Sequence, residues 1–382
     1  MNRLIIIGNG FDLSYGLESS YQHFLKYYID KCYKEYRIDT NLFSINSNNS
    51  EIKSISKFSE DNKFEFISDK IRFFEDLSIF LTPKGPLSID LKENLQTNNW
   101  VDVEALYFKC IIRLLDQFKK VLNQSNKDRY NEFLASLKQI NSEFKVLTDE
   151  FISYLKNQLI SDNLDLNNEI KKLLFYDIGS FVLGQNITSN CLILNFNYTK
   201  IINQIIASQQ FVHSINIHGS LDEESNPIIF GYGDYFHENY KDIENLNIPE
   251  YLRFIKSMEY PKTGNYKTLL NFLDNGLVPL DISDYDRKSI LEFEVLIYGH
   301  SCGLSDRILL KQIFEHKNCK QIYVAFHNNI DDYFNKTIEI SRHFDKKDEF
   351  LKKLQPFNEF LKIPQFSDYP LKDSEKQTSE IN

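Results

Sequence analysis

The sequence lacks the paired cysteines that most structural zinc sites use. No C-x-x-C occurs, and the five cysteines are scattered over the chain at Cys32, Cys110, Cys191, Cys302 and Cys319. This scatter argues against a structural zinc site and is typical of a protein from a reducing compartment. The sequence also has no H-E-x-x-H motif. We therefore expect no metal cofactor.

Long apolar runs are also absent. No stretch approaches the length that crosses a membrane. The first apolar run, residues 4–7, is too short for a signal peptide and leads straight into a glycine turn. These absences predict a cytoplasmic protein without a membrane partner. The net charge of −10 argues against broad binding to nucleic-acid phosphates.

Several short apolar segments have the composition of buried strands. Residues 4–7 are a continuous aliphatic run, as expected for a strand covered on both faces. Helical patterns such as 305–316 separate some of the later strands. Alternation of this kind predicts an α/β, Rossmann-like fold with a mainly parallel sheet. The predicted strands are 4–7, 191–196, 213–218, 227–230, 293–298 and 321–326.

A long block of helical character separates the first strand from the others. Apolar residues recur every three or four positions, and we expect them to form packed core. Residues 39–62 are polar and predict a loop or a poorly ordered insertion. The predicted helices of the block are 20–37, 64–81, 103–122 and 130–160.

The first strand must rejoin the later strands across this helical block. We therefore predict one α/β domain over residues 1–364, with a large helical insertion at about 20–185. Residues 365–382 are polar and charged, as expected for a C-terminal tail.

Four predicted strands end in glycine and small polar residues, at 8–10, 195–199, 217–220 and 298–306. The carboxyl ends of parallel strands lie along one edge of a sheet, where α/β proteins bind ligands. Each segment is ordinary by itself. Their convergence on one edge predicts a binding pocket there.

His218 and Asn197 are the candidate catalytic residues at this edge. An imidazole near neutrality suits proton transfer, so His218 is the candidate base. The alternative is a histidine that holds a loop by hydrogen bonding. The amide of Asn197 offers one acceptor and two donors for a ribose hydroxyl or a water. The alternative is an asparagine that satisfies turn backbone.

The opening turn is the candidate phosphate-binding segment. Glycine at positions 8 and 10 lets a pyrophosphate approach backbone amides, and Asp12 could bond a loop amide or a sugar hydroxyl. The motif is neither a complete G-x-G-x-x-G nor a P-loop. The predicted ligand-binding residues of this segment are Gly8, Asn9, Gly10, Phe11, Asp12 and Gly16.

The last of the four segments allows two interpretations. Ser301 and the amides of a following helix, with Ser305 as its N-cap, could face phosphate or ribose. Residues 299–303 also read Gly-x-Ser-x-Gly, formally a nucleophile elbow. We disfavour an α/β-hydrolase because it leaves the opening glycine turn unexplained. The remaining predicted binding residues are Tyr198, Gly299, His300, Ser301 and Asp306.

Together these motifs resemble the AbiH family of bacteriophage abortive-infection proteins. The resemblance is carried by Gly8-Asn9-Gly10-Phe11-Asp12-Leu13, Gly16-Leu17, Asn195-Phe196-Asn197-Tyr198, Ile217-His218-Gly219 and Tyr298-Gly299-His300-Ser301. It extends more loosely along most of the chain, and the helical block carries little of it.

More distantly, the same motifs resemble the NAD-binding SIR2 superfamily. The resemblance places Asn197 on the catalytic asparagine of sirtuins, His218 on their base and Ser301 near the ribose. The sirtuin Pro-Asp-Phe-Arg segment is replaced by Glu18-Ser19-Ser20, Thr199 stands for an aspartate, and the zinc cysteines are missing. These departures argue against protein deacylation.

The pattern is closer to SIR2-like defence proteins, and it implies an antiphage effector that binds NAD and hydrolyses its nicotinamide–ribose bond. The implied partners are NAD or a related nucleotide, a phage-derived trigger or partner defence protein, and a second copy of the chain. Two alternatives stay open, namely a non-catalytic nucleotide sensor and a nuclease or other toxin acting on nucleic acid.

Overall fold

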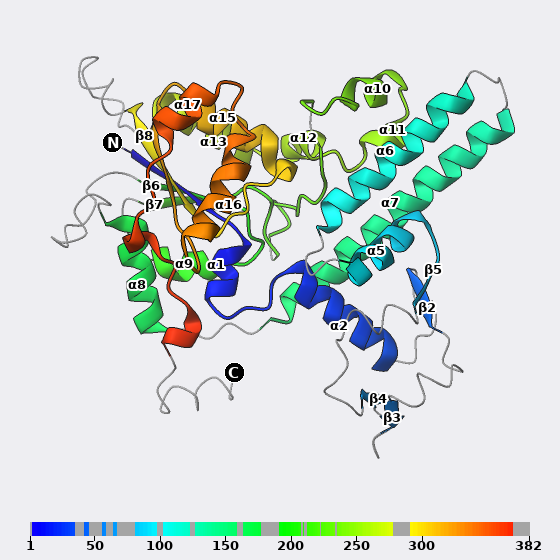
Figure 1. Ribbon diagram of the computed structural model, residues 1–382, viewed down its shortest axis with the longest axis horizontal. Coiled ribbons are helices and arrows are strands. Elements are labelled where there is room, and N and C mark those ends of the chain that lie inside the picture. The colour runs from blue at the N-terminus through cyan, green and yellow to red at the C-terminus, as the bar shows by residue number, and fades with distance from the viewer. Residues whose placement is uncertain are drawn as a thin grey trace. The chain divides into compact units, whose positions relative to one another are not determined.

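A computed structural model gives the fold of the chain (Figure 1). The chain divides into two compact units. The first comprises Met1–Glu18, Gln158–Ile229 and Glu259–Asn382, and the second Ser19–Asn157 and Phe230–Met258. The structure describes residues 2–34, 42–45, 56–58, 64–66, 81–97, 102–122, 127–158, 163–176, 191–207, 209, 212–221, 223–233, 235–277 and 291–369.

The first unit contains a five-stranded sheet in the order β7-β6-β1-β8-β9, and every neighbouring pair is parallel. This confirms the predicted Rossmann-like α/β fold. The chain order of the strands reverses between β1 and β8, which is the switch point where open α/β sheets bind ligands. The strands are β1 (Asn2–Ile7), β6 (Cys191–Asn195), β7 (Val212–Asn216), β8 (Phe293–Tyr298) and β9 (Cys319–Val324).

The register aligns the carboxyl ends of the central strands. Ile7 at the end of β1 pairs with Asn195 on one side and with Tyr298 on the other. Asn195 in turn pairs with Asn216, the last residue of β7. The segments that follow these four strands therefore leave the sheet side by side, as the sequence predicts.

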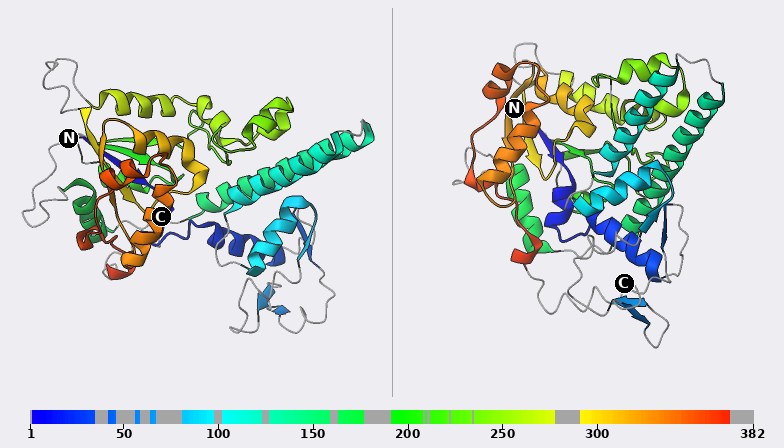
Figure 2. Two further views of the ribbon diagram at one scale, coloured as in Figure 1. Left: turned by 45° about the horizontal axis from the view of Figure 1, so that its top comes forward. Right: turned by 45° about the vertical axis from the view of Figure 1, so that its right-hand side comes forward.

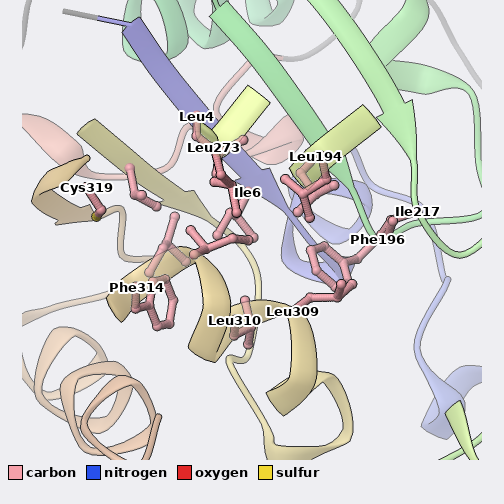
Figure 3. Close-up of a cluster of buried hydrophobic side chains, with 14 of the residues drawn as sticks. Leu4, Ile6, Leu194, Phe196, Ile217, Leu273, Leu309, Leu310, Phe314 and Cys319 are labelled. Carbon is pink, nitrogen blue, oxygen red and sulfur yellow. The ribbon is translucent and has the colours of Figure 1, made fainter. Parts of the chain in front are cut away.

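Helices cover both faces of the sheet. Side chains alternate along β1, so Leu4 and Ile6 join one core cluster while Ile5 and Ile7 join the other. The first cluster packs against α13 (Asn265–Asn275) and α15 (Arg307–Glu315), and Figure 3 shows Phe196 and Ile217 together at one end of it. The second packs against α1 (Asn9–Ser14), α8 (Leu164–Phe175) and α9 (Ile201–Ile206).

The chain after β9 completes the first unit. Phe326 donates its N–H to the Leu361 carbonyl, and the Ile363 N–H is donated back to Phe326, so the last described segment runs beside the end of β9. The remaining elements of the unit are η1 (Tyr260–Lys262), η2 (Leu304–Asp306), α16 (Ile330–Ser341), α17 (Lys347–Lys353), η3 (Glu359–Leu361) and η4 (Phe366–Asp368), and α12 (Lys256–Glu259) spans the boundary between the units.

The second unit is built around two long helices, α6 (Val103–Leu122) and α7 (Lys127–Lys156), which lie side by side in Figures 1 and 2. Tyr107 stacks on Phe144, and Phe118 packs against Phe133. Residue numbers rise along one helix as they fall along the other, so the pair is antiparallel. The other elements are α2 (Tyr21–Lys34), β2 (Phe43–Ile45), β3 (Ser56–Phe58), β4 (Phe64–Phe66), β5 (Leu81–Pro83), α5 (Pro86–Thr97), α10 (Tyr240–Asn245) and α11 (Pro249–Leu252).

Three local predictions are wrong. Residues 64–66 and 81–83, at the ends of the predicted helix 64–81, are strands, and two further short strands lie within the predicted loop 39–62. Residues 67–80 lie outside the described part of the chain. Residues 227–230 form no strand of the sheet, because Pro227 lacks an N–H and the segment instead turns back so that Ile229 donates to the His218 carbonyl.

The predicted helices 103–122 and 130–160 are confirmed as α6 and α7, and the predicted helix 20–37 as α2 over its described residues. Most of the apolar residues expected to form core in α6 and α7 are buried where described, for example Leu114, Leu147 and Phe151, whereas Phe133 is half-buried. Among the described residues, no helix is both long enough and apolar enough to cross a membrane. The prediction of one domain with an insertion stays a prediction.

Candidate active site

A buried carboxylate connects the opening turn to the segment after β6. The Asn197 side-chain amide donates to Asp12 Oδ1 at 2.8 Å and to the Gly8 carbonyl at 3.0 Å. The Thr199 hydroxyl lies within 3.0 Å of both Asp12 oxygens. Both amide hydrogens of Asn197 are thus committed to the protein. Its Oδ1 accepts no hydrogen bond from the described residues, so this oxygen is the atom left for a ligand or a water.

Asp12 itself is unusual because it is buried with no cation among its partners in the described part of the chain. Burial raises the pKa of the Asp12 carboxyl to about 7, against the lowering effect of its hydrogen bonds from Thr199 and Asn197. The folded protein therefore holds a proton on Asp12 at pH values where the unfolded chain has lost it. The free energy of unfolding must fall as the pH rises from about 4 to 7.

Asp12→Asn is expected to remove this part of the pH dependence. The shift from 3.8 to about 7 corresponds to a contribution of about 4 kcal/mol that wild type loses across the window. Urea unfolding of both proteins at pH 4.5, 6 and 8 measures it. The stability difference between variant and wild type should move in favour of the variant as the pH rises. A constant difference would show that Asp12 is ionised throughout.

Asp345→Asn is the matched control for this titration. Asp345 is exposed, and the Lys311 ammonium lowers the pKa of its carboxyl. Its carboxyl is therefore mostly ionised at pH 4.5 in both the folded and the unfolded state. The substitution should therefore leave the slope between pH 4.5 and 8 unchanged.

The second polar cluster of the site places one carboxylate between two histidines. Asp306 Oδ1 lies 3.2 Å from His218 Nε2, and Asp306 Oδ2 lies 3.5 Å from His300 Nε2. All three side chains are buried. The Phe196 ring packs against both imidazoles, with centroid distances of 5.0 Å to His218 and 4.3 Å to His300. Segments that follow β6, β7 and β8 thus meet at one point, as predicted.

Tyr260 is a member of this cluster that the sequence analysis missed. Its hydroxyl lies 3.2 Å from His218 Nε2, and its ring lies nearly parallel to the imidazole. The residue comes from η1, which no strand-end motif marks. Thr199 was also missed as an Asp12 partner, because it was interpreted only as a departure from the sirtuin pattern.

The glycine turn uses its amides within the protein. Gly10 donates its N–H to the Gly299 carbonyl at 2.8 Å, and Gly8 donates to the Tyr298 carbonyl at 3.2 Å. The Phe11 N–H is donated to the Gly8 carbonyl. A Cβ on Gly10 would lie 2.7 Å from Gly299 Cα, so the two turns touch backbone to backbone. Close backbone contact between the two turns therefore explains why glycine is found in the opening turn. The contact of these glycines with a pyrophosphate stays a prediction.

Four of the other predicted binding residues have a contact or a backbone position within the fold that the structure describes. The Phe11 ring is buried in the core against Tyr298. Gly16 closes the turn after α1 with a φ of +83°. Tyr198 donates its hydroxyl to the Ile229 carbonyl at 3.4 Å. Asn9 is the first residue of α1. None of these positions shows a polar side chain held ready for a ligand in the way that Asn197 does.

The segment after β8 does not have the geometry of a nucleophile elbow. Ser301 is exposed, and its hydroxyl makes no hydrogen bond with the described residues. The positive φ falls at Cys302, at +56°, rather than at the serine. Burial raises the pKa of the Cys302 thiol to about 12, so this residue is no nucleophile either. The predicted N-cap Ser305 is also wrong, since α15 begins after Asp306 and the Ser305 hydroxyl donates to Asp306.

Within the described ranges, no group of three or more histidine, cysteine or acidic residues is arranged to hold a metal ion. The four cysteines whose side chains the structure describes are buried and form no disulfide.

Fold and site define a class of protein, namely a Rossmann-like α/β protein whose polar residues gather at the switch point of a parallel sheet. The family model described as bacteriophage abortive infection AbiH matches residues 4–328, which include all four site segments. The chain belongs to the AbiH family, and the resemblance seen in its motifs is confirmed. No curated protein matches the chain. Family membership supports an antiphage role in abortive infection.

Proposed function

We propose that the protein is an abortive-infection effector that binds NAD at the carboxyl edge of its sheet and hydrolyses the nicotinamide–ribose bond. One observation carries the proposal. Asn197 and His218, the two residues matched to the SIR2 catalytic pair, follow adjacent strands, and the ring of Phe196, the residue before Asn197, packs against His218. They lie at the edge where doubly wound sheets bind dinucleotides.

The reaction needs little from the protein besides positioning and a base. Water adds to C1′ of the nicotinamide ribose, and the bond from C1′ to the pyridinium nitrogen breaks. The bonding electron pair leaves with nicotinamide, which departs neutral, and the water proton goes to a base. The products are ADP-ribose, nicotinamide and one proton. By analogy with glycoside hydrolysis, the transition state is oxocarbenium-like, so an activated nucleophile is not required.

The described contacts support a role for each residue in the proposed reaction. The Oδ1 atom of Asn197 accepts a hydrogen bond from the water or a ribose hydroxyl, while Asp12 and the Gly8 carbonyl hold its amide hydrogens. His218 takes the water proton. Because Asp306 lies on its Nε2 side, the basic lone pair of His218 is the one on Nδ1.

The test is incubation of the purified full chain with NAD, with nicotinamide followed by chromatography. Release of nicotinamide and ADP-ribose supports the proposal. A parallel arm adds lysate from phage-infected cells, because an effector of this kind is held inactive until triggered. Binding of NAD with no turnover in either arm would favour the sensor alternative. Neither binding nor turnover would reject NAD as the ligand.

Asn197→Ala is expected to reduce NAD hydrolysis at least about 100-fold. The variant also loses two buried hydrogen bonds, so its free energy of unfolding should fall by about 1–3 kcal/mol. Initial rates of nicotinamide release and urea unfolding measure the two effects separately.

Thr199→Val is the matched control for Asn197. It also removes a buried donor to Asp12, yet it leaves the Asn197 Oδ1 atom in place. Its stability should fall by a similar amount, while hydrolysis stays within about tenfold of wild type. Equal losses of activity in both variants would mean that the Asp12 network matters and that the Asn197 oxygen does not.

A further inference from the structure

We propose that Asp306 is a positioning residue that fixes the tautomer of His218, and that His300 holds Asp306 for this task. The inference rests on the proposed function for its catalytic consequence. It reassigns Asp306 and His300, which the sequence predicts as ligand-binding residues.

The first observation is that Asp306 occupies an N-cap position without capping. It directly precedes α15, and aspartate is among the best N-cap residues because its oxygen accepts from the first free amides of a helix. Here the side chain makes no such bond. Its two oxygens lie instead toward His218 and His300. A local preference is overridden by contacts to two histidines, of which His218 comes from another segment, and such an override is typical of functional sites.

The second observation fixes the proton on His300. The Cys302 N–H donates to His300 Nδ1 at 2.9 Å, so this nitrogen carries a lone pair. The proton of the neutral ring is on Nε2, which lies 3.5 Å from Asp306 Oδ2. His300 thus presents an N–H to the carboxylate. The Ser305 hydroxyl donates a hydrogen bond to the same oxygen.

The other carboxylate oxygen then decides the state of His218. An ionised carboxylate accepts hydrogen bonds and donates none. The 3.2 Å approach of Asp306 Oδ1 to His218 Nε2 therefore favours a proton on Nε2 and a lone pair on Nδ1. The Tyr260 hydroxyl oxygen, also 3.2 Å from Nε2, is a second acceptor for this proton. Burial of His218 and Asp306 strengthens the preference, because no bulk water competes.

Two side chains donate hydrogen bonds to backbone carbonyls of the loop that carries His300. Lys336 of α16 donates its ammonium to the His300 carbonyl at 2.7 Å. His343 donates its Nε2–H to the Cys302 carbonyl at 2.8 Å, and burial lowers the pKa of His343 to about 4, so the ring is neutral. The backbone on both sides of Ser301 is thus fixed. This keeps the His300 ring directed at Asp306.

The principal test compares wild type with Asp306→Asn, both labelled with ¹⁵N-histidine. In wild type we expect the nitrogen shifts of the Nε2–H tautomer for His218. The asparagine amide can donate to Nε2, so the variant should move His218 toward the Nδ1–H tautomer. If so, kcat for NAD hydrolysis falls about 100- to 10,000-fold, while KM changes less than about threefold.

The outcomes separate this inference from the proposed function. If wild type does not cleave NAD, the function fails, and the NMR shifts still decide whether Asp306 sets the tautomer. An unchanged His218 tautomer in Asp306→Asn overturns the inference whatever the rate. A raised KM with unchanged kcat also overturns it, and returns Asp306 to ligand binding. Asp345→Asn, the same change at an exposed position, should leave shifts and rates unaltered.

Two substitutions of His300 guard against simple misfolding. Glutamine places an amide donor near the position of Nε2, so His300→Gln should keep kcat within about tenfold of wild type. Asparagine is too short to reach Asp306 but can accept the Cys302 N–H. His300→Asn should therefore lose activity as Asp306→Asn does, with a similar change in the His218 shifts. Retained activity in His300→Asn would reject the role of His300.

Discussion

His218→Ala is expected to lower the rate of NAD hydrolysis by about 100- to 10,000-fold, the usual effect of removing a general base. The His218 imidazole follows β7 and contacts Asp306 and Tyr260. Among the described residues of the site, no second base makes both of these contacts. Single-turnover rates of nicotinamide release measure the effect.

His213→Ala is the control for that change. His213 lies on β7 itself, five positions before His218, and its side chain is exposed. The control should hydrolyse NAD at the wild-type rate. If folded His218→Ala does so too, His218 is a loop-holding histidine, which is the alternative that the sequence leaves open.

Gly10→Ala should destabilise the fold by about 3 kcal/mol or more, the upper range for forcing atoms into a packed site. In an ordinary helix the same change is stabilising by up to about 1 kcal/mol. The sign reverses here because the new Cβ would lie 2.7 Å from Gly299 Cα and 2.8 Å from the Gly299 carbonyl oxygen. These are backbone atoms, which cannot rotate away. Denaturant unfolding of both proteins measures the loss.

Gly264→Ala provides the comparison, since a Cβ there meets no atom within 4 Å. Its stability should stay within about 1 kcal/mol of wild type. One result would contradict the structural interpretation of Gly10. It is a Gly10→Ala protein that has the melting temperature of wild type but is no longer stabilised by NAD. That result would place a ligand, rather than Gly299, against the opening turn.

The parts of the fold that could be predicted are those that depend on the composition of one short segment. The aliphatic runs of β1, β6 and β8 are buried from both faces, so composition alone marks them as strands. The short strands β2 to β5 carry no such run and were missed. The segment at 227–230 has a strand-like composition, yet Pro227 and the turn at Gly219 prevent it from joining the sheet.

The convergence of the strand-end segments could be predicted, because the carboxyl ends of parallel strands lie along one edge of a sheet. Which of their residues bind a ligand stays a prediction. The pairing of side chains within the site could not be predicted. Asp12 meets Asn197, and His218 meets Asp306, only through folding, and no local pattern encodes contacts across such separations. For the same reason Asp306 was predicted to bind a ligand, although its carboxylate lies between two histidines.

The central position of β1 has a consequence for the synthesis of the protein. Its hydrogen-bonding neighbours begin at Cys191 and Phe293, so the first 298 residues of the chain must be synthesised before both partner strands of β1 are complete. Pairings of this range form slowly. A nascent chain that stops before β8 also lacks His300 and Asp306. If the protein hydrolyses NAD as proposed, such an interrupted product should be inactive.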